Sequence, residues 1–334
     1  MDSEVYEILE TCGEGTFGIV YKARQKSTGT LVAVKKAFEV RYERPARERI
    51  ANEIKILRSV EHENIISIFS SDGTYKFVDS SSRILFCSDE TNKTSIIFPY
   101  CPLTLKDLLE NYVLTFSEKK SCIWMILNGV AHIHESAIIH RDLSPRNILI
   151  NGIGVVKIAD FGVAWADTNN NFEPRGEMKF EVGTRHYRAP ELLFSAGNYT
   201  NVIDLWSLGC IFAEFYTKPV GSPLFDGGSD IEQLSKIFRV LGIPTEKSWP
   251  EMKDFPDYGK LTFKIKECLG LTELQLPEAH SPGVIQFISK FLKYSFNERM
   301  TANRALQDSI FDSDDFSKIR IELDKLKRAS QVPG

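Results

Sequence analysis

The stretch His140-Arg141-Asp142-Leu143-Ser144-Pro145-Arg146-Asn147 determines how the rest of the chain is interpreted. It follows an amphipathic helical run and leads into the apolar run Ile148-Leu149-Ile150. Thirteen residues after Asn147 comes a second carboxylate turn, Asp160-Phe161-Gly162. Two acids and one amide in short polar loops beside apolar runs can hold Mg²⁺ with a nucleotide and orient a hydroxyl nucleophile. The stretch therefore predicts a phosphoryl-transfer site.

Composition and charge exclude several classes of protein. The chain has 334 residues, 43% apolar and 26% charged, which is enough for a sizeable core in one large or two modest domains. A net charge of −4 does not point to nucleic acid, and no apolar run approaches membrane-spanning length. Six scattered cysteines, without a CxxC pair or a secretory leader, predict reduced thiols in a cytoplasmic or nuclear protein.

Residues 6–22 have the pattern of a strand, a glycine turn and a second strand. The turn is Gly13-Glu14-Gly15-Thr16-Phe17-Gly18, whose glycines would let the backbone approach phosphates closely. An ordinary hairpin fits the same residues. A dinucleotide-binding turn does not, because the β-rich residues 19–23 follow the turn where an amphipathic helix would be required.

A lysine and a glutamate upstream of the catalytic stretch are expected to pair. Alternation in residues 31–36 puts Ala33 and Lys35 on one strand face, and an inward lysine needs an anionic partner. A solvated lysine on an edge strand is the alternative. Glu53 points with the apolar stripe of the helix that follows, at residues 50–57. An internal Lys35–Glu53 ion pair would aim the lysine at nucleotide phosphates and would break if the helix swung away.

The pattern of the chain changes at residues 98–103. Before them, apolar runs at 66–69, 84–86 and 96–98 predict strands, in a region longer and more polar than a minimal lobe needs. Pro99 and Pro102 lack N–H groups, which leaves carbonyls and the N–H of Cys101 free to read an adenine edge, although a plain linker fits equally well. Helical patterns follow, at residues 105–112, 117–135, 204–216, 230–241 and 284–294.

These patterns predict an α+β protein with two lobes. Residues 1–100 would form a small antiparallel-sheet lobe with one key helix, and residues 101–312 a larger, mainly helical lobe. Residues 313–334 form a charge-rich tail with helical spacing that could dock or be disordered. In the large lobe, Arg299 is placed to pair with Glu191.

Each polar residue of the catalytic stretch has a predicted role. Asp142 would accept or orient the proton of the substrate hydroxyl, Asn147 and Asp160 would coordinate Mg²⁺, and Leu149 would form an apolar floor beneath the base. Any one of the polar residues alone fits a turn-forming role. The set at this spacing, with Lys35 and the glycine turn upstream, makes the prediction specific.

Over residues 6–312 the sequence resembles the eukaryotic protein kinases, whose motifs occur here in the same order. Tyr187-Arg188-Ala189-Pro190-Glu191 and the long segment 221–264 resemble the cyclin-dependent-kinase branch. Thr184-Arg185 and Trp249-Pro250-Glu251-Met252 resemble the CDK-activating kinases and the cell-cycle-related kinase. The resemblance implies a bilobal protein-kinase fold and transfer of phosphate from Mg²⁺-bound ATP to Ser or Thr of other kinases in cell-cycle control.

The resemblance also implies which residues form the site. Thr184, in a Gly-Thr-x-x-Tyr pattern, joins Asp142 and Arg146 in the catalytic set and favours Ser/Thr over Tyr specificity. The residues implied to contact ATP are Cys12, Gly13, Glu14, Gly15, Thr16, Phe17, Gly18, Ile19, Val20, Ala33, Lys35, Glu53, Cys101 and Leu149.

The first departure from the family lies in the catalytic stretch. The family normally carries a lysine after the Asp-Leu pair that contacts the γ-phosphate, and here that position is Ser144. A cation stands two positions further on, at Arg146, in an arrangement similar to that of some tyrosine kinases. We hypothesise that Arg146 supplies the missing charge.

The second departure concerns activation. Relatives carry a phosphorylated threonine where this chain has Lys179, and three arginines for that phosphate where it has Asn52, Arg141 and Trp165. The loop is therefore predicted to be ordered without phosphorylation, with Arg141 facing Glu177 or Glu181.

Other regulatory features of relatives also differ. Phe17 replaces an inhibitory tyrosine of relatives, although Thr16 could still carry such a phosphate. The helix at residues 46–53 matches cyclin-binding helices poorly, so cyclin binding is left open.

Two alternatives to the CDK-activating function are considered. A pseudokinase or scaffold would have lost phosphoryl transfer, but Lys35, Glu53, Asp142, Asn147 and Asp160 are all present. A conventional cyclin-dependent or mitogen-activated kinase acting on non-kinase substrates fits the sequence nearly as well. The expected partners are protein substrates, cyclin-dependent kinases among them, with no nucleic acid or membrane. The protein is expected to be a monomer.

Overall fold

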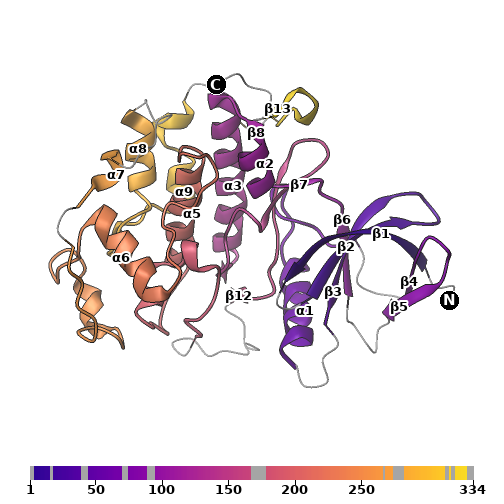
Figure 1. The fold of residues 1–334 in the computed structure, drawn as a ribbon, viewed down its shortest axis with the longest axis horizontal. Helices are drawn as coiled ribbons and strands as arrows, with labels where there is room; N and C mark the ends of the chain where they lie inside the picture. Colours follow the sequence, from indigo (N-terminus) through magenta and orange to yellow (C-terminus); the bar gives the residue numbers. More distant parts are fainter. Residues whose placement is uncertain are drawn as a thin grey trace.

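Alternating apolar residues build a six-stranded sheet in the N-terminal lobe, seen at the right of Figure 1. The computed structural model describes residues 4–15, 18–38, 44–69, 74–88, 95–166, 178–265, 268–273, 282–312, 316 and 320–328. The strands are β1 (Glu4–Gly15), β2 (Gly18–Gln25), β3 (Leu31–Ala37), β4 (Tyr75–Val78), β5 (Ile84–Ser88) and β6 (Ser95–Pro99), in the order β5-β4-β1-β2-β3-β6. The neighbours are antiparallel, except that β4 runs parallel to β1.

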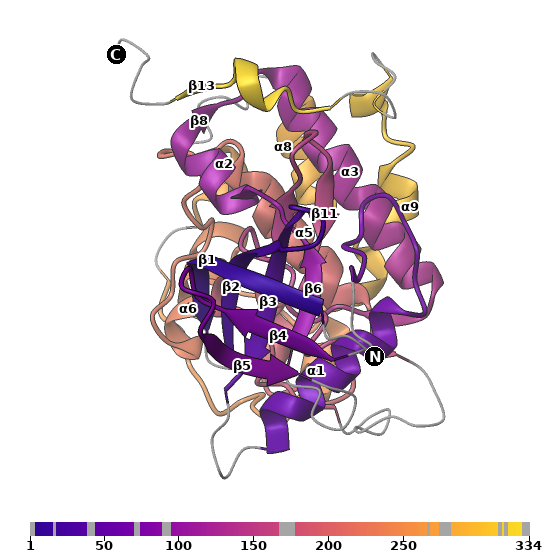
Figure 2. The ribbon, with the colours of Figure 1, turned by 90° about the vertical axis from the view of Figure 1, so that its right-hand side faces the viewer.

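The long polar region between residues 66 and 98 contains a hairpin that extends this sheet beyond β1. Strand β4 pairs with β1, and β5 forms the edge of the sheet beside β4 (Figure 2). Aromatic packing explains the position, because Phe77 stacks on Phe86 at 4.4 Å and on Tyr6 at 5.7 Å between ring centroids. The expected strand at residues 66–69 is not formed, although Phe69 N donates to Ile97 O at 2.8 Å.

One helix, α1 (Arg44–Leu57), accompanies the sheet, as the sequence predicts. Its apolar stripe is buried, with Ile50, Ile54 and Leu57 at most 5% exposed. Glu53 lies on the same stripe and is 1% exposed. A carboxylate buried to this degree requires a partner, and the site shows which one.

The larger lobe consists mainly of helices, seen at the left of Figure 1. Threonine capping boxes at Thr104 and Thr115 begin α2 and α3. The longer helices are α2 (Leu105–Asn111), α3 (Phe116–Glu135), α5 (Val202–Glu214), α6 (Asp230–Leu241) and α8 (Pro282–Ser289), and the shorter ones α4 (Pro190–Leu193), α7 (Gly270–Glu273) and α9 (Ala302–Ala305). The helix expected over 284–294 thus ends at Ser289, before a turn.

Short strands position the catalytic stretch at the junction of the lobes. Its flanking strands belong to two small sheets. Separately, none of the described helices has the length and apolar character needed to cross a membrane. The strands are β7 (Leu103–Thr104), β9 (Ile138–Ile139), β10 (Ile148–Ile150), β11 (Val156–Ile158) and β12 (Trp165–Ala166), with β10 between β11 and β7 and β12 beside β9.

The described part of the C-terminal tail docks on the large lobe. Strand β13 (Lys327–Arg328) pairs with β8 (Tyr112–Val113), as the upper part of Figure 2 shows. Ile321 is 1% exposed, and its N–H donates to Gly154 O at 3.1 Å. A Cβ on Gly154 would lie 2.0 Å from Ile321 O, so the turn at Gly154 requires glycine for this contact. The boundaries of the lobes at residues 100 and 312 stay predictions.

Candidate active site

The predicted Lys35–Glu53 ion pair is formed. Lys35 Nζ lies 2.7 Å from Glu53 Oε2 and also 2.7 Å from Asp160 Oδ1. Burial lowers the pKa of Lys35, but the two carboxylates outweigh it and raise the pKa overall. Burial likewise raises the pKa of Asp160, and the charge of Lys35 outweighs it and holds that pKa below its usual range. Burial also raises the pKa of Glu53, and the charge of Lys35 opposes that shift.

Helix α1 is also tied to the segment that follows Asp160. Phe161 N–H donates to Glu53 Oε1 at 3.3 Å, and Asn52 Nδ2 donates to Ala164 O at 2.9 Å. The ring of Phe161 is fully buried and meets the His140 ring edge-on at 4.8 Å between centroids. These contacts fix the helix, the second carboxylate turn and the catalytic stretch relative to one another.

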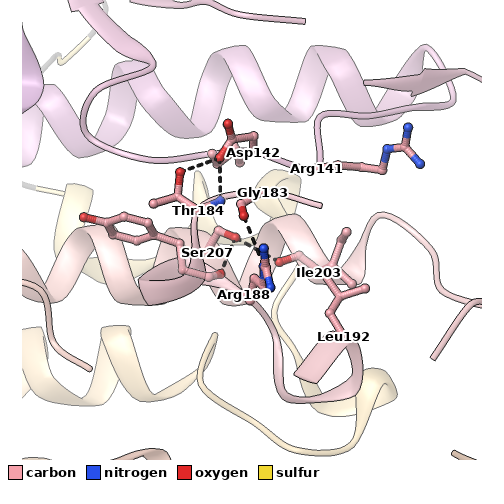
Figure 3. Close-up of a pocket in the computed structure, with 10 residues that line it drawn as sticks. Arg141, Asp142, Gly183, Thr184, Arg188, Leu192, Ile203 and Ser207 are labelled. Atoms are coloured by element: carbon pink, nitrogen blue, oxygen red, sulfur yellow. Dashed lines mark hydrogen bonds between the residues drawn. The ribbon is translucent and has the colours of Figure 1, made fainter. Parts of the chain in front are cut away.

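Asp142 is held by Thr184 and by Asn147, and Figure 3 shows the bonds from Thr184. Both the N–H and the Oγ1 of Thr184 donate to Asp142 Oδ1 at 2.8 Å. Asn147 Nδ2 donates to Asp142 Oδ2 at 3.0 Å and to Asp142 O at 2.9 Å. Burial raises the pKa of Asp142, and the hydrogen bonds from Thr184 oppose that shift. The arrangement suits a carboxylate that orients a hydroxyl group.

Asp204 binds the backbone at the start of the catalytic stretch. It was not predicted as part of the site. Its carboxylate accepts from His140 N at 2.8 Å, from Arg141 N at 2.9 Å and contacts His134 Nε2 at 3.0 Å. It is 1% exposed, at the start of the mainly apolar helix α5. A buried carboxylate on a mainly apolar helix must have partners, and that pattern is the signal that could have identified it.

Each residue predicted to hold Mg²⁺ has an oxygen that is not hydrogen-bonded to any described residue. Asp160 Oδ2 makes no hydrogen bond to any described residue, and Asn147 donates only through Nδ2, which leaves Oδ1 as an acceptor. Within the described ranges no cluster of three or more His, Cys, Asp or Glu side chains could hold a metal alone. Mg²⁺ suits such a site, because it keeps waters and takes one or two protein oxygens together with substrate phosphates.

The predicted nucleotide contacts come from both lobes. Cys12, Gly13, Glu14 and Gly15 end β1, and Gly18, Ile19 and Val20 begin β2 opposite them. A Cβ on Gly18 would lie 2.2 Å from Lys36 O, so only glycine fits there. Three half-buried residues, Ala33 on β3, Cys101 after β6 and Leu149 on β10, pack against the main core. Thr16 and Phe17 lie outside the described residues.

The two unusual positions of the catalytic stretch differ in exposure. Ser144 is 2% exposed and Arg146 is exposed. Arg146 forms no ion pair with any described residue. It lies near enough to the Tyr187 phenol to lower its pKa, although burial and Glu214 raise that pKa overall. A cation is thus available four residues after Asp142.

The segment around Thr184 is held by a glycine and an arginine. Gly183 has a φ of 75°, and a Cβ there would lie 2.4 Å from Arg141 O. Arg188 Nε donates to the carbonyls of Val182 at 2.9 Å and Gly183 at 3.1 Å (Figure 3). A pocket beside it is lined by Asp142, Thr184, Arg188, Leu192, Ile203 and Ser207, among others.

The predicted Arg299–Glu191 pair is confirmed. Arg299 Nη1 and Nη2 lie 2.6 and 2.8 Å from the two oxygens of Glu191, and both side chains are fully buried. Such a bidentate pair is rigid. It fixes the end of the segment that begins at Gly183.

Comparison with known proteins agrees with this geometry. A sequence profile for the protein kinase domain matches residues 6–311. The chain belongs to the protein kinases. Cyclin-dependent kinase 20 of Danio rerio is 39% identical over 92% of this chain and 84% of its own length, and that of Homo sapiens is 37% identical over 92% and 82%. A solved structure, the yeast RNA Pol II CTD kinase CTDK-1 complex, has a TM-score of 0.74 at 29% identity over 94% of this chain and 95% of its own.

The kinase is therefore of the cyclin-dependent-kinase-like, Ser/Thr-specific type, and it uses ATP and Mg²⁺. Asn147 and Asp160 would hold Mg²⁺, which supplies neutralising charge to the phosphates. Lys35, fixed by Glu53, would orient the phosphates. Asp142, fixed by Thr184 and Asn147, would orient the substrate hydroxyl and accept its proton.

Proposed function

We propose that this kinase is active without phosphorylation of its activation segment and phosphorylates other kinases of the cyclin-dependent type. The proposal is supported by the hydrogen bonds between helix α1 and the activation segment. Asn52 stands where relatives place a phosphate-binding arginine, and its amide donates to Ala164 O at 2.9 Å. Helix α1 is thus bonded to the segment directly, while Lys35 and Glu53 are paired. These contacts support the proposal, because they join the parts through groups other than a phosphate.

One assay tests both halves of the proposal. Purified, phosphatase-treated protein with Mg-ATP is offered an unphosphorylated cyclin-dependent kinase, with Asp142→Asn as the inactive control. We expect phosphate on the activation-loop threonine of the substrate. Loss of activity after phosphatase treatment would refute independence from phosphorylation. Transfer to other proteins only would refute the kinase substrate, and no transfer to any protein would favour the pseudokinase alternative.

The same assay bears on partners and place of action. We propose that the kinase works as a monomer in the cytoplasm or nucleus, where its six unpaired cysteines stay reduced. Parallel reactions with and without an added cyclin test whether the monomer alone is active. A requirement for cyclin would show that the monomer is insufficient.

A second candidate, a kinase of proline-directed type acting on non-kinase substrates, is favoured by Gly183. Its carbonyl already accepts from Arg188 Nε at 3.1 Å, which makes it less available to the N–H of the substrate residue after the phosphorylated one. Proline lacks that N–H and loses nothing. Two peptides that differ only in Pro or Ala after the acceptor measure the effect. A large preference for Pro favours this candidate, since it selects by local sequence.

We also propose that Arg146 replaces the catalytic-loop lysine. It is exposed beside Asp142 and forms no ion pair within the described part of the chain. Arg146→Ala should lower turnover sharply, whereas Arg146→Lys keeps the charge and should retain more activity. Wild-type turnover in Arg146→Ala would refute this role.

A further inference from the structure

The phenol oxygen of Tyr199 joins the catalytic stretch to the activation segment. Tyr199 is 3% exposed, and its Oη donates to Lys179 O at 2.6 Å. The same oxygen accepts from Arg141 Nη1 at 3.2 Å. Arg141 Nε in turn donates to Val163 O at 2.5 Å. A continuous run of hydrogen bonds therefore connects the start of the activation segment to Lys179.

Tyr199 is well placed to act as a fixed support. It lies three residues before the start of α5, whose Asp204 accepts from Arg141 N at 2.9 Å. Met178, 2% exposed, donates its N–H to Gly197 O at 3.0 Å, so a second bond holds the activation segment beside Tyr199. The side chain of Arg141 points away from Asp142, as Figure 3 shows. Arg141 is thus held by its backbone on one side and by Tyr199 on the other.

The chemistry of a phenol suits this junction. It can donate one hydrogen bond and accept others, so it can join a carbonyl to a guanidinium. A phosphate can accept from arginines but cannot donate to a carbonyl when fully ionised. Lys179 occupies the position at which relatives are phosphorylated, and Tyr199 bonds to its backbone, which any residue provides.

We propose that Tyr199 is a positioning residue that performs, without charge, the ordering role of an activating phosphate. This inference rests on the proposed activity of the unphosphorylated enzyme. Its effect reaches the substrate side of the site through Arg141, because Arg141 O packs directly against Gly183. Gly183 precedes Thr184, which holds Asp142. Loss of the phenol should therefore disturb substrate orientation more than nucleotide binding.

Tyr199→Phe tests the role, because it removes one oxygen and keeps the ring. With protein shown by mass spectrometry to be unphosphorylated, we expect kcat to fall about tenfold, from hydrogen bonds worth about 1–2 kcal/mol. The KM for ATP should change less than twofold, because the phenol bonds to Arg141 and Lys179 and not to Lys35 or Glu53. The matched control is Tyr294→Phe, which loses a 2.6 Å bond from its Oη to Gly242 O. Its kcat should stay that of the wild type.

A rescue variant separates positioning from a general loss of structure. Lys179→Glu in the Tyr199→Phe background offers a carboxylate to Arg141 and should restore most of the lost kcat. The inference is overturned if Tyr199→Phe keeps wild-type kcat, if Tyr294→Phe loses as much, or if Lys179→Glu restores nothing. An inactive, unphosphorylated wild type would instead overturn the proposed function. Full activity of the wild type beside a wild-type kcat in Tyr199→Phe overturns only the role of Tyr199.

Discussion

The two sides of Asp142 are built from different kinds of interaction. On the nucleotide side, full charges meet, with Lys35 at 2.7 Å from both Glu53 and Asp160. On the substrate side, uncharged groups mediate contacts of charged ones, since the hydroxyl of Thr184 bonds to Asp142 and the phenol of Tyr199 joins Arg141 to Lys179 O. The charged groups on the nucleotide side are required in every kinase, because they bind and orient the negatively charged phosphates of ATP. Contacts of uncharged groups need no added phosphate, which would suit the proposed activity without phosphorylation.

This difference has a consequence for regulation. A segment ordered by a phosphate is switched by adding and removing about two negative charges. A segment ordered by Asn52 and Tyr199 has no such charge to remove. If the proposed activity without phosphorylation holds, a phosphate on this segment does not switch the kinase, and the nucleotide side should be the more sensitive to mutation.

The largest effect is expected when the charged side is broken. Lys35→Met leaves the Glu53 and Asp160 carboxylates close together without their cation. Removing one partner of such a group costs about 3–5 kcal/mol, so kcat/KM should fall at least about 10²-fold. Steady-state kinetics with ATP varied measure the loss. Lys36→Met, the next residue on β3, whose ammonium lies 4.2 Å from the Phe86 ring centroid, is the control. Equal losses in the two variants would contradict the special role of Lys35.

Glu214, a buried carboxyl beside Tyr187, is expected to bind a proton near neutral pH. Burial raises the pKa of Glu214 to about 7, and the Tyr187 hydroxyl and Lys106 lower it only in part. The folded state then binds its proton more tightly than the unfolded state, so stability falls as pH rises from about 4.5 to 7. The contribution is up to about 3 kcal/mol.

Glu214→Gln should flatten that pH dependence. Relative to the variant, the wild type should lose stability between pH 5 and pH 8, because only the wild type must ionise a buried group. Urea unfolding at several pH values measures the difference, with Glu246→Gln, on an exposed residue, as the control. Parallel curves for wild type and Glu214→Gln would show that the carboxyl has an ordinary pKa.

The hold of Thr184 on Asp142 should have a smaller effect than loss of Lys35. Thr184→Val removes the Oγ1 bond of 2.8 Å and keeps the backbone N–H bond to the same oxygen. A hydrogen bond to a charged group is worth about 1.5–3 kcal/mol, so kcat should fall about 10- to 100-fold. Thr184→Ser retains the hydroxyl and should stay within a fewfold of wild type. Equal kcat for the Val and Ser variants would exclude the hydroxyl from the mechanism.

The charged side was predicted from the sequence more completely than the uncharged side. The Lys35–Glu53 and Arg299–Glu191 pairs were both expected, because a charge in an apolar setting must find its opposite. The kinase fold was likewise expected from motif order. Neutral side chains carry no such requirement. Tyr199 could have occupied an ordinary core position, and nothing in its neighbours indicated a bond to Lys179.

Packing between distant parts of the chain explains the other differences. The hairpin β4–β5 was expected as strands, but its parallel pairing with β1 depends on the Tyr6–Phe77 stack. The tail was left undecided, because its docking depends on Gly154, over 160 residues before Ile321. Such contacts are specified by shape, which a pattern of residue types does not reveal.

The smallest effect is expected at an exposed ion pair, where charge is present but water competes. Arg320 Nη2 lies 2.7 Å from Glu63 Oε1, with side chains 31% and 53% exposed. Pairs of this kind contribute about 0–1 kcal/mol, so Arg320→Ala should change the free energy of unfolding by less than about 1 kcal/mol. Salt should erase the difference, because it screens exposed charges and not the Lys35 group. Urea unfolding at 0.05 and 1 M salt measures it. A loss of several kcal/mol, or one that persists at high salt, would mean that the tail depends on this pair as strongly as the active site depends on Lys35.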